Sequence, residues 1–238
     1  GEHGCTRGLH WTQPMTEGVT ISRSIGSVAV LAVLAVAGCT QVVSGKALAP
    51  SSRGPADIQS LLLDADEVNS IMGTSDLEVL ESGDGPDDTV DAGPPACHGV
   101  IYISGETEYG NTDFSEMRWE AVASDTGSVV QSVAKFPSPS DASSFVADQA
   151  EAWDACRRTT ITAVDKENGT KTRYQVQSIS SQNDKVSAVT TVSDLQWQCQ
   201  HVLQAVSSYV LEISACASSV SDEADTVASE VAAKIGSG

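Results

Sequence analysis

Alternating apolar and polar residues predict strands over most of the second half of the chain. The clearest segment is 209–215, where an apolar residue stands at every second position from Tyr209 to Ala215, the period of a half-buried strand. The same pattern, bounded by turn residues, predicts further strands at 77–80, 117–123, 129–136, 159–164, 170–179, 186–192 and 196–206. The pair Asn168-Gly169 is a strong signal for a hairpin between two of them. Residues 100–103 fit either a short helix or a short strand, and both interpretations stay open.

Apolar residues spaced three and four positions apart predict helices elsewhere in the chain. The expected helices are 57–63, 64–72, 138–156 and 220–235. Asp57 and Asp64 are suitable N-caps for the first two, and Gly73 is a suitable stop. Helices, then an antiparallel meander that carries one helix, then a final helix predict an α+β fold, with helices packed on an antiparallel β-sheet.

One long stretch has no apolar period. Residues 81–95 are acidic and rich in Gly and Pro, which predicts a loop. Its carboxylates do not follow the Asp-x-Asp-x-Asp-Gly order of a calcium loop. We therefore expect a solvated loop here, with no metal ion.

The longest apolar run, Val28–Cys39, has the layout of a secretory signal. Arg23 precedes it, and the uncharged stretch from Ser24 to Ala37 is 14 residues long, whereas a membrane-spanning helix needs about 20. Its end, Val36-Ala37-Gly38-Cys39, resembles the lipobox of bacterial lipoproteins. That resemblance implies that Cys39 receives a diacylglyceryl thioether and becomes the new N-terminus.

This leader predicts the domain organisation. Residues 1–38 are expected to be a signal peptide, and a more credible translation start at Met15, or at Val19, would leave residues 1–14 untranslated. Residues 39–55 are expected to form the lipidated cysteine and a tether rich in Ser, Gly, Ala and Pro. Residues 56–238 are then the folded domain.

The charge of the chain narrows the classes of partner. Its formal net charge is −19 at pH 7, which opposes binding to nucleic acid and to anionic lipid surfaces. The charge is consistent with plain solubility of an exported domain or with an acidic surface that meets a protein partner. We expect no nucleic-acid partner.

Four cysteines remain after Cys39, and in an exported chain they predict two disulfides with three possible connectivities. A two-residue turn at Ser207-Ser208 makes Val206 and Tyr209 the closing pair of a hairpin. Counting outward, Cys199 then faces Cys216 at a non-hydrogen-bonded position, where side chains stand closest. The predicted disulfides are Cys199–Cys216 and Cys97–Cys156. No Cys-x-x-Cys pair offers a zinc site of ordinary spacing.

Three segments together resemble a known family. Trp153-Asp-Ala-Cys156, Trp197-Gln-Cys199-Gln200 and Ala215-Cys216, followed by an amphipathic terminal helix, are similar to the extracellular sensor domain of mycobacterial PknH-type serine/threonine kinases. The resemblance covers about residues 56–235 and implies an α+β domain with two disulfides and a cleft for a small ligand. It also implies a domain that recurs alone in lipoproteins, and this chain carries no kinase domain sequence.

Catalytic signatures are missing after Cys39: the chain has no Gly-x-Ser-x-Gly, His-Glu-x-x-His or Gly-x-x-x-x-Gly-Lys motif. His98 is the outside candidate for a catalytic base, and His201 fits better as a satisfied strand residue. We expect no enzyme, no cofactor and no metal.

The expected function is that of a lipid-anchored, non-catalytic sensor or ligand-binding module on the extracytoplasmic face of the cell membrane. Its site is expected in a cleft between the sheet and its helices, lined by Trp119, Tyr174 and Tyr209, each of which also fits a core position. The ligand is an unidentified small molecule. The alternative is a structural or interaction lipoprotein that binds an envelope protein.

Overall fold

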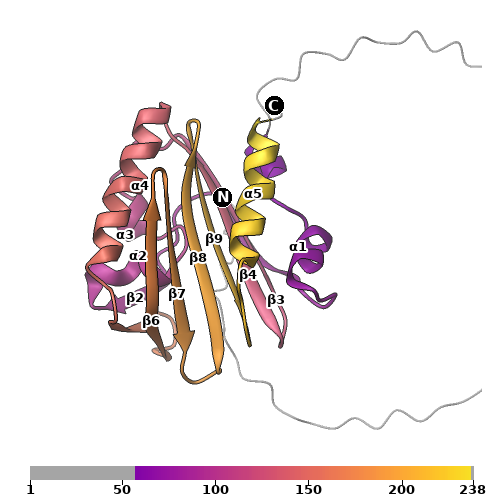
Figure 1. Ribbon diagram of the computed structural model, residues 1–238, viewed down its shortest axis with the longest axis vertical. Coiled ribbons are helices and arrows are strands. Elements are labelled where there is room, and N and C mark those ends of the chain that lie inside the picture. Colours follow the sequence, from indigo (N-terminus) through magenta and orange to yellow (C-terminus); the bar gives the residue numbers. More distant parts are fainter. Residues whose placement is uncertain (1–56, 237–238) are drawn as a thin grey trace, which may run out of the picture. The chain divides into compact units, whose positions relative to one another are not determined.

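A nine-stranded antiparallel sheet is the centre of the fold, with strand order β1-β3-β4-β9-β8-β7-β6-β5-β2 (Figure 1). The structure, a computed structural model, describes residues 57–236. The strands are β1 (Glu78–Gly83), β2 (Val90–Gly93), β3 (Glu116–Ala123), β4 (Gly127–Lys135), β5 (Thr160–Asp165), β6 (Lys171–Gln182), β7 (Lys185–Val192), β8 (Trp197–Val206) and β9 (Tyr209–Ala217). The helices are η1 (Ile58–Leu61), α1 (Ala65–Met72), η2 (Pro95–Cys97), α2 (His98–Ile101), α3 (Glu106–Tyr109), α4 (Pro139–Asp154) and α5 (Glu223–Gly236). The α+β prediction is confirmed.

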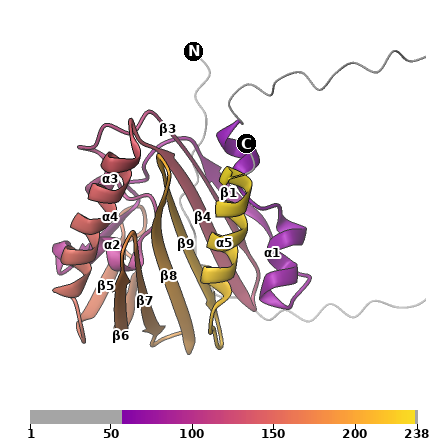
Figure 2. The same cartoon turned by 45° about the horizontal axis from the view of Figure 1, so that its top comes forward.

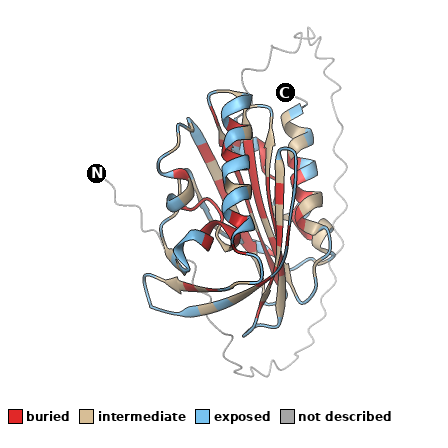
Figure 3. Ribbon diagram, turned by 60° about the vertical axis from the view of Figure 1, so that its left-hand side comes forward, coloured by how far each residue is buried: buried red, intermediate tan, exposed pale blue. Residues whose placement is uncertain are grey.

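Helices cover both faces of the sheet (Figures 1 and 2). One face packs against α4, α2 and α3, through side chains such as Phe145, Trp153 and Tyr109. The opposite face packs against η1, α1 and α5, through Val68 and Val227 among others. Figure 3 shows the buried residues concentrated on the central strands and on the inner sides of the helices. The domain therefore has two cores, one on each side of a single sheet.

The central strands are buried on both faces, and this corrects one expectation. In β9 the predicted apolar residues Leu211, Ile213 and Ala215 are buried and Tyr209 is half-buried, but Val210 and Glu212 are buried as well. The expectation of a half-buried strand at 209–215 is therefore wrong, because helices pack on the second face too. Glu212 is consequently a carboxylate in the interior.

Both predicted disulfides are confirmed. Cys199 and Cys216 are register partners on β8 and β9, with their Cα atoms 4.1 Å apart. Cys97 and Cys156 join η2 to the end of α4 across 5.8 Å between Cα atoms. The first bond closes the predicted hairpin at Ser207-Ser208, and the second ties the short helices to the sheet's main covering helix.

The expected loop at 81–95 is wrong in part. β1 continues to Gly83, and β2 forms inside the stretch by pairing with β5, where Val90 faces Asp165. β2 has only four residues, and its partner lies far along the chain, so no local period reveals it. Two smaller points concern the predicted elements. The expected helix at 57–63 contains only a single 3₁₀ turn, η1. Residues 100–103, for which both a helix and a strand were considered, begin within the short helix α2.

The connection between β1 and β2 determines the shape of the sheet. These two strands are neighbours in sequence, yet they form the opposite edges of the strand order. Residues 84–89 alone join them. Because an extended chain gains at most about 3.6 Å per residue, the two edges can be separated by no more than roughly 25 Å. The sheet is therefore curled, and residues 84–89 bridge its open side.

The predicted signal peptide, the predicted lipidation site Cys39 and the predicted tether lie outside the described residues. Within residues 57–236, no helix is both long and apolar enough to cross a membrane.

Candidate ligand-binding groove

An open groove with a volume of about 520 Å³ lies where the two edges of the curled sheet approach one another. It is lined by the end of β1, by the bridging segment 84–89 (called the wall below), by Trp119 of β3 and by the turn after β5. The lining residues are Glu81, Ser82, Gly83, Asp84, Gly85, Pro86, Asp87, Asp88, Thr89, Trp119, Lys166 and Glu167. The groove thus depends on the curvature of the whole sheet.

Trp119 supports the first part of the wall. Its side chain is 7% exposed and lies against Gly83, its register partner on β1. A Cβ atom at position 83 would stand 2.5 Å from Nε1 of the indole, so only glycine fits there. The same Nε1–H donates a hydrogen bond to the carbonyl oxygen of Gly85 at 3.0 Å. Trp119 therefore fixes where the chain leaves β1.

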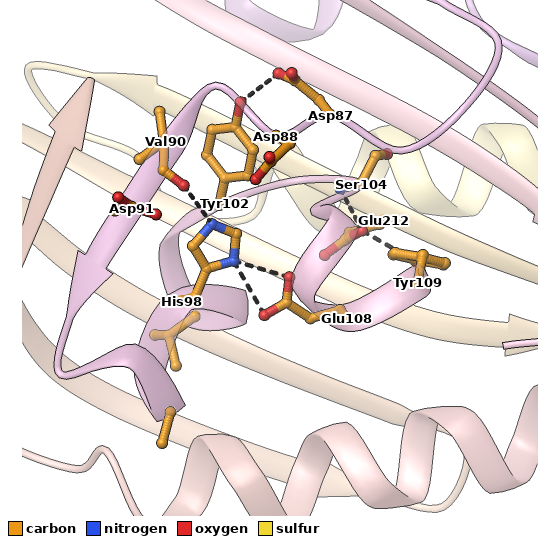
Figure 4. A network of polar contacts seen from close by, with 12 residues as sticks. Asp87, Asp88, Val90, Asp91, His98, Tyr102, Ser104, Glu108, Tyr109 and Glu212 are labelled. Carbon is orange, nitrogen blue, oxygen red and sulfur yellow. Dashed lines mark hydrogen bonds and ion pairs between the residues drawn. The ribbon is translucent and has the colours of Figure 1, made fainter. Parts of the chain in front are cut away.

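Backbone hydrogen bonds fix the middle of the wall. The amide of Asp87 donates to the carbonyl of Ser104 at 2.8 Å, and the amide of Glu106 donates to the carbonyl of Asp87 at 2.9 Å. The hydroxyl of Tyr102 donates to the carboxylate of Asp87 (Figure 4). Burial, followed by this hydrogen bond to Asp87, raises the pKa of Tyr102, so the phenol remains a donor. The wall is therefore attached to the segment that carries α2 and α3.

The lining of the groove is strongly acidic. It contains five carboxylate side chains, from Glu81, Asp84, Asp87, Asp88 and Glu167, whereas Lys166 is its one lysine or arginine. Lys166 forms an ion pair with Asp88 and another, at 3.3 Å, with Asp91. Burial, and then the charge of Asp87, raise the pKa of Glu81. A cation in the groove would relieve this repulsion.

Two buried histidines lie beneath the wall, each paired with a glutamate. His98 Nδ1 is 2.8 Å from Glu108 Oε2, and His201 Nε2 is 3.2 Å from Glu212 Oε1. Glu212 also accepts hydrogen bonds from the amide of Ser104 at 2.9 Å and from the hydroxyl of Tyr109 at 3.0 Å (Figure 4). Burial, and then the charge of Glu212, raise the pKa of Tyr109 well above its ordinary value. This network attaches the α2–α3 segment to the sheet.

The three predicted lining aromatics do not lie together. Trp119 lines the groove. Tyr174 packs at the border of the same core, but on β6 near the other end of the strand order, and burial raises its pKa to about 12. Tyr209 packs against the core on the opposite face of the sheet, with Lys135 Nζ 5.9 Å from its ring centroid. Of the three, Trp119 alone contributes to the groove.

The predicted histidine roles fit the geometry in different ways. His201 is a strand residue whose two nitrogens both have hydrogen-bonding partners, as expected. His98 is 3% exposed, too deeply buried to act as a base on a substrate. Within residues 57–236, no group of three or more His, Cys, Asp or Glu side chains is arranged to hold a metal ion.

Sequence reasoning missed the acidic lining. Residues 81–89 were assigned to a solvated loop because carboxylates in a Gly-rich stretch are usually exposed. Two glycines, Gly83 and Gly85, were the available signal, since both stand where the chain meets Trp119. Both glycines contact Trp119, which is 34 residues away from Gly85, and local sequence patterns do not reveal such a contact.

Comparison with known proteins gives a consistent result. A family model described as "PknH-like extracellular domain" matches residues 54–236. The chain is 25% identical over 190 residues to the serine/threonine-protein kinase PknH of Mycobacterium bovis, covering 75% of this chain and 30% of that protein. The same kinase from Mycobacterium tuberculosis is also 25% identical, with 29% of its length covered. The chain thus spans less than a third of these relatives.

A solved structure is similar in fold. The crystal structure of the extracellular domain of PknH from Mycobacterium tuberculosis superimposes with a TM-score of 0.71 at 23% sequence identity. The match covers 76% of this chain and 95% of that domain.

Proposed function

The chain belongs to the PknH-like extracellular domain family, and from that membership we propose that it is a non-catalytic ligand-binding sensor module of the cell envelope. The serine/threonine kinase named in its relatives corresponds to a whole protein of which this chain matches about 30%. The proposal therefore concerns binding alone.

The observation that carries the proposal is the groove between the sheet edges. Its volume of about 520 Å³ is in the usual range for small-molecule sites, and the accessible part of Trp119 offers an apolar surface. Five carboxylates against one lysine favour a ligand with a positive charge. We therefore propose a small organic cation, or a cationic group on a larger envelope molecule, as the ligand.

The membrane attachment is part of the same proposal. The lipobox-like sequence Val36-Ala37-Gly38-Cys39 supports lipidation of Cys39, and residues 40–55 would tether the domain at the extracytoplasmic face. At that position the groove would be accessible to small molecules of the cell envelope.

The test is a thermal-shift screen of the purified chain against quaternary ammonium compounds, polyamines and short lysine peptides, with matched neutral and anionic compounds. A ligand that binds only the folded state stabilises it by about 2.7 kcal/mol at a concentration of a hundred times Kd. We expect hits among the cations, and we expect Asp88→Asn to weaken them. Asp125→Asn, in the turn between β3 and β4, makes the same charge change away from the groove and should leave binding unchanged.

Three outcomes would redirect the proposal. Hits confined to neutral or anionic compounds would contradict the ligand class. A broad screen without any shift would favour the alternative, an interaction lipoprotein that binds an envelope protein through its acidic surface. Turnover of a screened compound would show an enzyme.

A further inference from the structure

His98 donates to two acceptors from a buried position. Its Nδ1 lies 2.8 Å and 3.0 Å from the two carboxylate oxygens of Glu108, and its Nε2 lies 3.1 Å from the carbonyl oxygen of Val90. The side chains of His98 and Glu108 are 4% and 9% exposed. A carbonyl oxygen can only accept, and so can an ionised carboxylate, so both nitrogens of the ring must carry a proton to satisfy these contacts. The geometry matches an imidazolium beside a carboxylate (Figure 4).

A neutral ring cannot satisfy the same contacts. With one proton, His98 would leave either the carbonyl of the half-buried Val90 or the carboxylate of Glu108, whose side chain is 9% exposed, without its donor. An unpaired buried carboxylate is the more costly of the two, so the remaining proton would stay on Nδ1 and the contact to Val90 would be lost. Loss of the proton therefore breaks the hydrogen bond between the His98 ring and the first residue of β2.

The position of Val90 connects this pair to the groove. Val90 is the first residue of β2 and follows directly after the wall at 84–89. The backbone of the wall is also attached to Ser104, just before α3, and to Glu106, the first residue of α3, which also carries Glu108. A Cβ atom at Gly105 would lie 2.3 Å from Glu108 Oε2 and 2.6 Å from His98 Cε1. The side chains of His98 and Glu108 therefore pack directly against the backbone at Gly105.

The surrounding charges favour the protonated ring. Two carboxylates, those of Glu108 and Glu212, interact electrostatically with His98. Several other titratable groups stand on the elements packed against α2 and beside His98. These are Asp91 of β2, Asp165 of β5, Glu106 and Tyr109 of α3, Asp141, Asp148, Glu151 and Asp154 of α4, Tyr102 next to α2, and His201 of β8. No lysine or arginine stands on those elements.

We propose that His98 and Glu108 form a protonation-dependent latch on the groove, closed while the imidazole carries two protons and released from Val90 when it loses one. The inference rests on the proposed function for its biological meaning, because it makes ligand binding depend on the pH outside the membrane. The latch itself is a property of the fold and can be tested without a ligand.

The direction of the pH effect follows from the raised pKa of His98. Burial alone would lower this pKa, but the hydrogen bond and charge of Glu108, the carbonyl of Val90 and the charge of Glu212 outweigh it, so the pKa stands above 6.5. The native state therefore holds the proton more tightly than the unfolded chain. The latch contributes its full stabilisation below about pH 6.5 and loses it as the pH rises through the native pKa.

The experiment is long-range ¹H–¹⁵N NMR of the histidine rings in the whole chain, recorded as a function of pH together with amide hydrogen exchange of residues 84–93. We expect His98 to show two protonated nitrogens below its midpoint and a midpoint above 6.5. After correction for intrinsic rates, exchange should quicken across that midpoint, by up to tenfold for every pH unit that separates it from 6.5.

Glu108→Gln is the informative variant, because its amide oxygen can still accept from Nδ1 while the negative charge is gone. It should lower the His98 midpoint and move the change in exchange with it. Asp125→Asn, an exposed carboxylate in the turn between β3 and β4 and on none of the elements packed against α2, is the control and should shift neither. If Glu108→Gln fails to fold, the titration of the unmodified chain still decides the matter.

Two results would overturn the latch. One is a neutral His98 ring throughout the range in which the fold is stable. The other is exchange of residues 84–93 that does not follow the His98 titration. Neither result depends on a ligand, so a failed ligand screen with an intact titration would contradict the proposed function and leave the latch standing.

Discussion

Gly83 of β1 lies directly against the indole of Trp119 on β3, so close that a Cβ atom at position 83 would overlap Nε1, Cε2 and Cζ2 of the ring. Gly83→Ala should therefore push the indole away from its hydrogen bond to Gly85 and destabilise the fold, by about 1–3 kcal/mol as for other overpacked sites. Urea unfolding measures this. Gly85→Ala is the control, because nothing lies within 4 Å of its Cβ position. Equal effects of the two substitutions would contradict the close packing.

The ionised side chain of Glu81 should lower the stability of the fold and strengthen the binding of a cationic ligand. Burial and the charge of Asp87 raise its pKa, so the native state disfavours its ionised form. Glu81→Gln should therefore stabilise the fold at neutral pH, by about 0.5 kcal/mol or less because the side chain is only partly buried and solvent screens its charge. The gain should disappear once the pH falls below about 4.5, where the carboxyl is protonated in both states.

The same substitution should weaken binding of a cationic ligand, and in the unmodified chain binding should weaken as the pH falls through the raised pKa of Glu81. Unfolding curves and calorimetric titrations across pH measure the two effects. A variant that is less stable at neutral pH would show that the charge of Glu81 is compensated in the native groove.

The two disulfides should differ in what they contribute. The bond between Cys199 and Cys216 closes a loop with a sequence separation of 17, and that between Cys97 and Cys156 one of 59. In the chain-entropy description these are worth about 3 and about 4 kcal/mol. Replacing each pair by alanines, so that no free thiol remains, and comparing the free energies of unfolding checks this. Removal of the longer link should also quicken amide exchange in η2 and α2 more than in the central strands, whereas a purely entropic effect on the unfolded chain would quicken exchange through global unfolding equally in both.

Cys39→Ala should prevent lipidation and leave the leader attached. Two or more acyl chains bind a membrane stably, because each buried CH₂ contributes about 0.8 kcal/mol. Mass spectrometry of the N-terminal peptide and detergent phase partition of the two forms measure the change. A variant that keeps the same mature N-terminus and still enters the detergent phase would contradict the lipobox interpretation.

The elements that could be predicted from the sequence are those whose signal is local. Strands β8 and β9 show their own apolar pattern and turn, and that register sufficed to pair Cys199 with Cys216. The strand β2 could not be predicted, because it exists only through pairing with β5, and α3 is a single turn held by Glu212 and the wall. A buried carboxylate such as Glu212 also departs from the ordinary apolar pattern of a strand's inner face. It is explained only by its partners Ser104, Tyr109 and His201, two of which lie far away in the sequence.

The groove shows the same limit. Trp119 was predicted as a lining residue because it is an aromatic residue on a strand. The carboxylates opposite it were not, because sheet curvature alone brings residues 84–89 and the turn at Lys166 to one place. Tyr209 was grouped with Trp119 by residue type, although alternation and strand order set it on the opposite face.

The bridging of the sheet by residues 84–89 also imposes an order of assembly. The strand before the bridge pairs with β3 and the strand after it pairs with β5, where Val90 meets Asp165. In a chain that emerges from its N-terminus, β1 can pair as soon as β3 is available, but β2 must wait until residue 165 of β5 has emerged. Contacts so distant in sequence close late and slowly, because the loop entropy is lost before the pairing compensates for it. The groove can therefore form only after β2 has paired with β5, so its appearance reports that both edges of the sheet are in place.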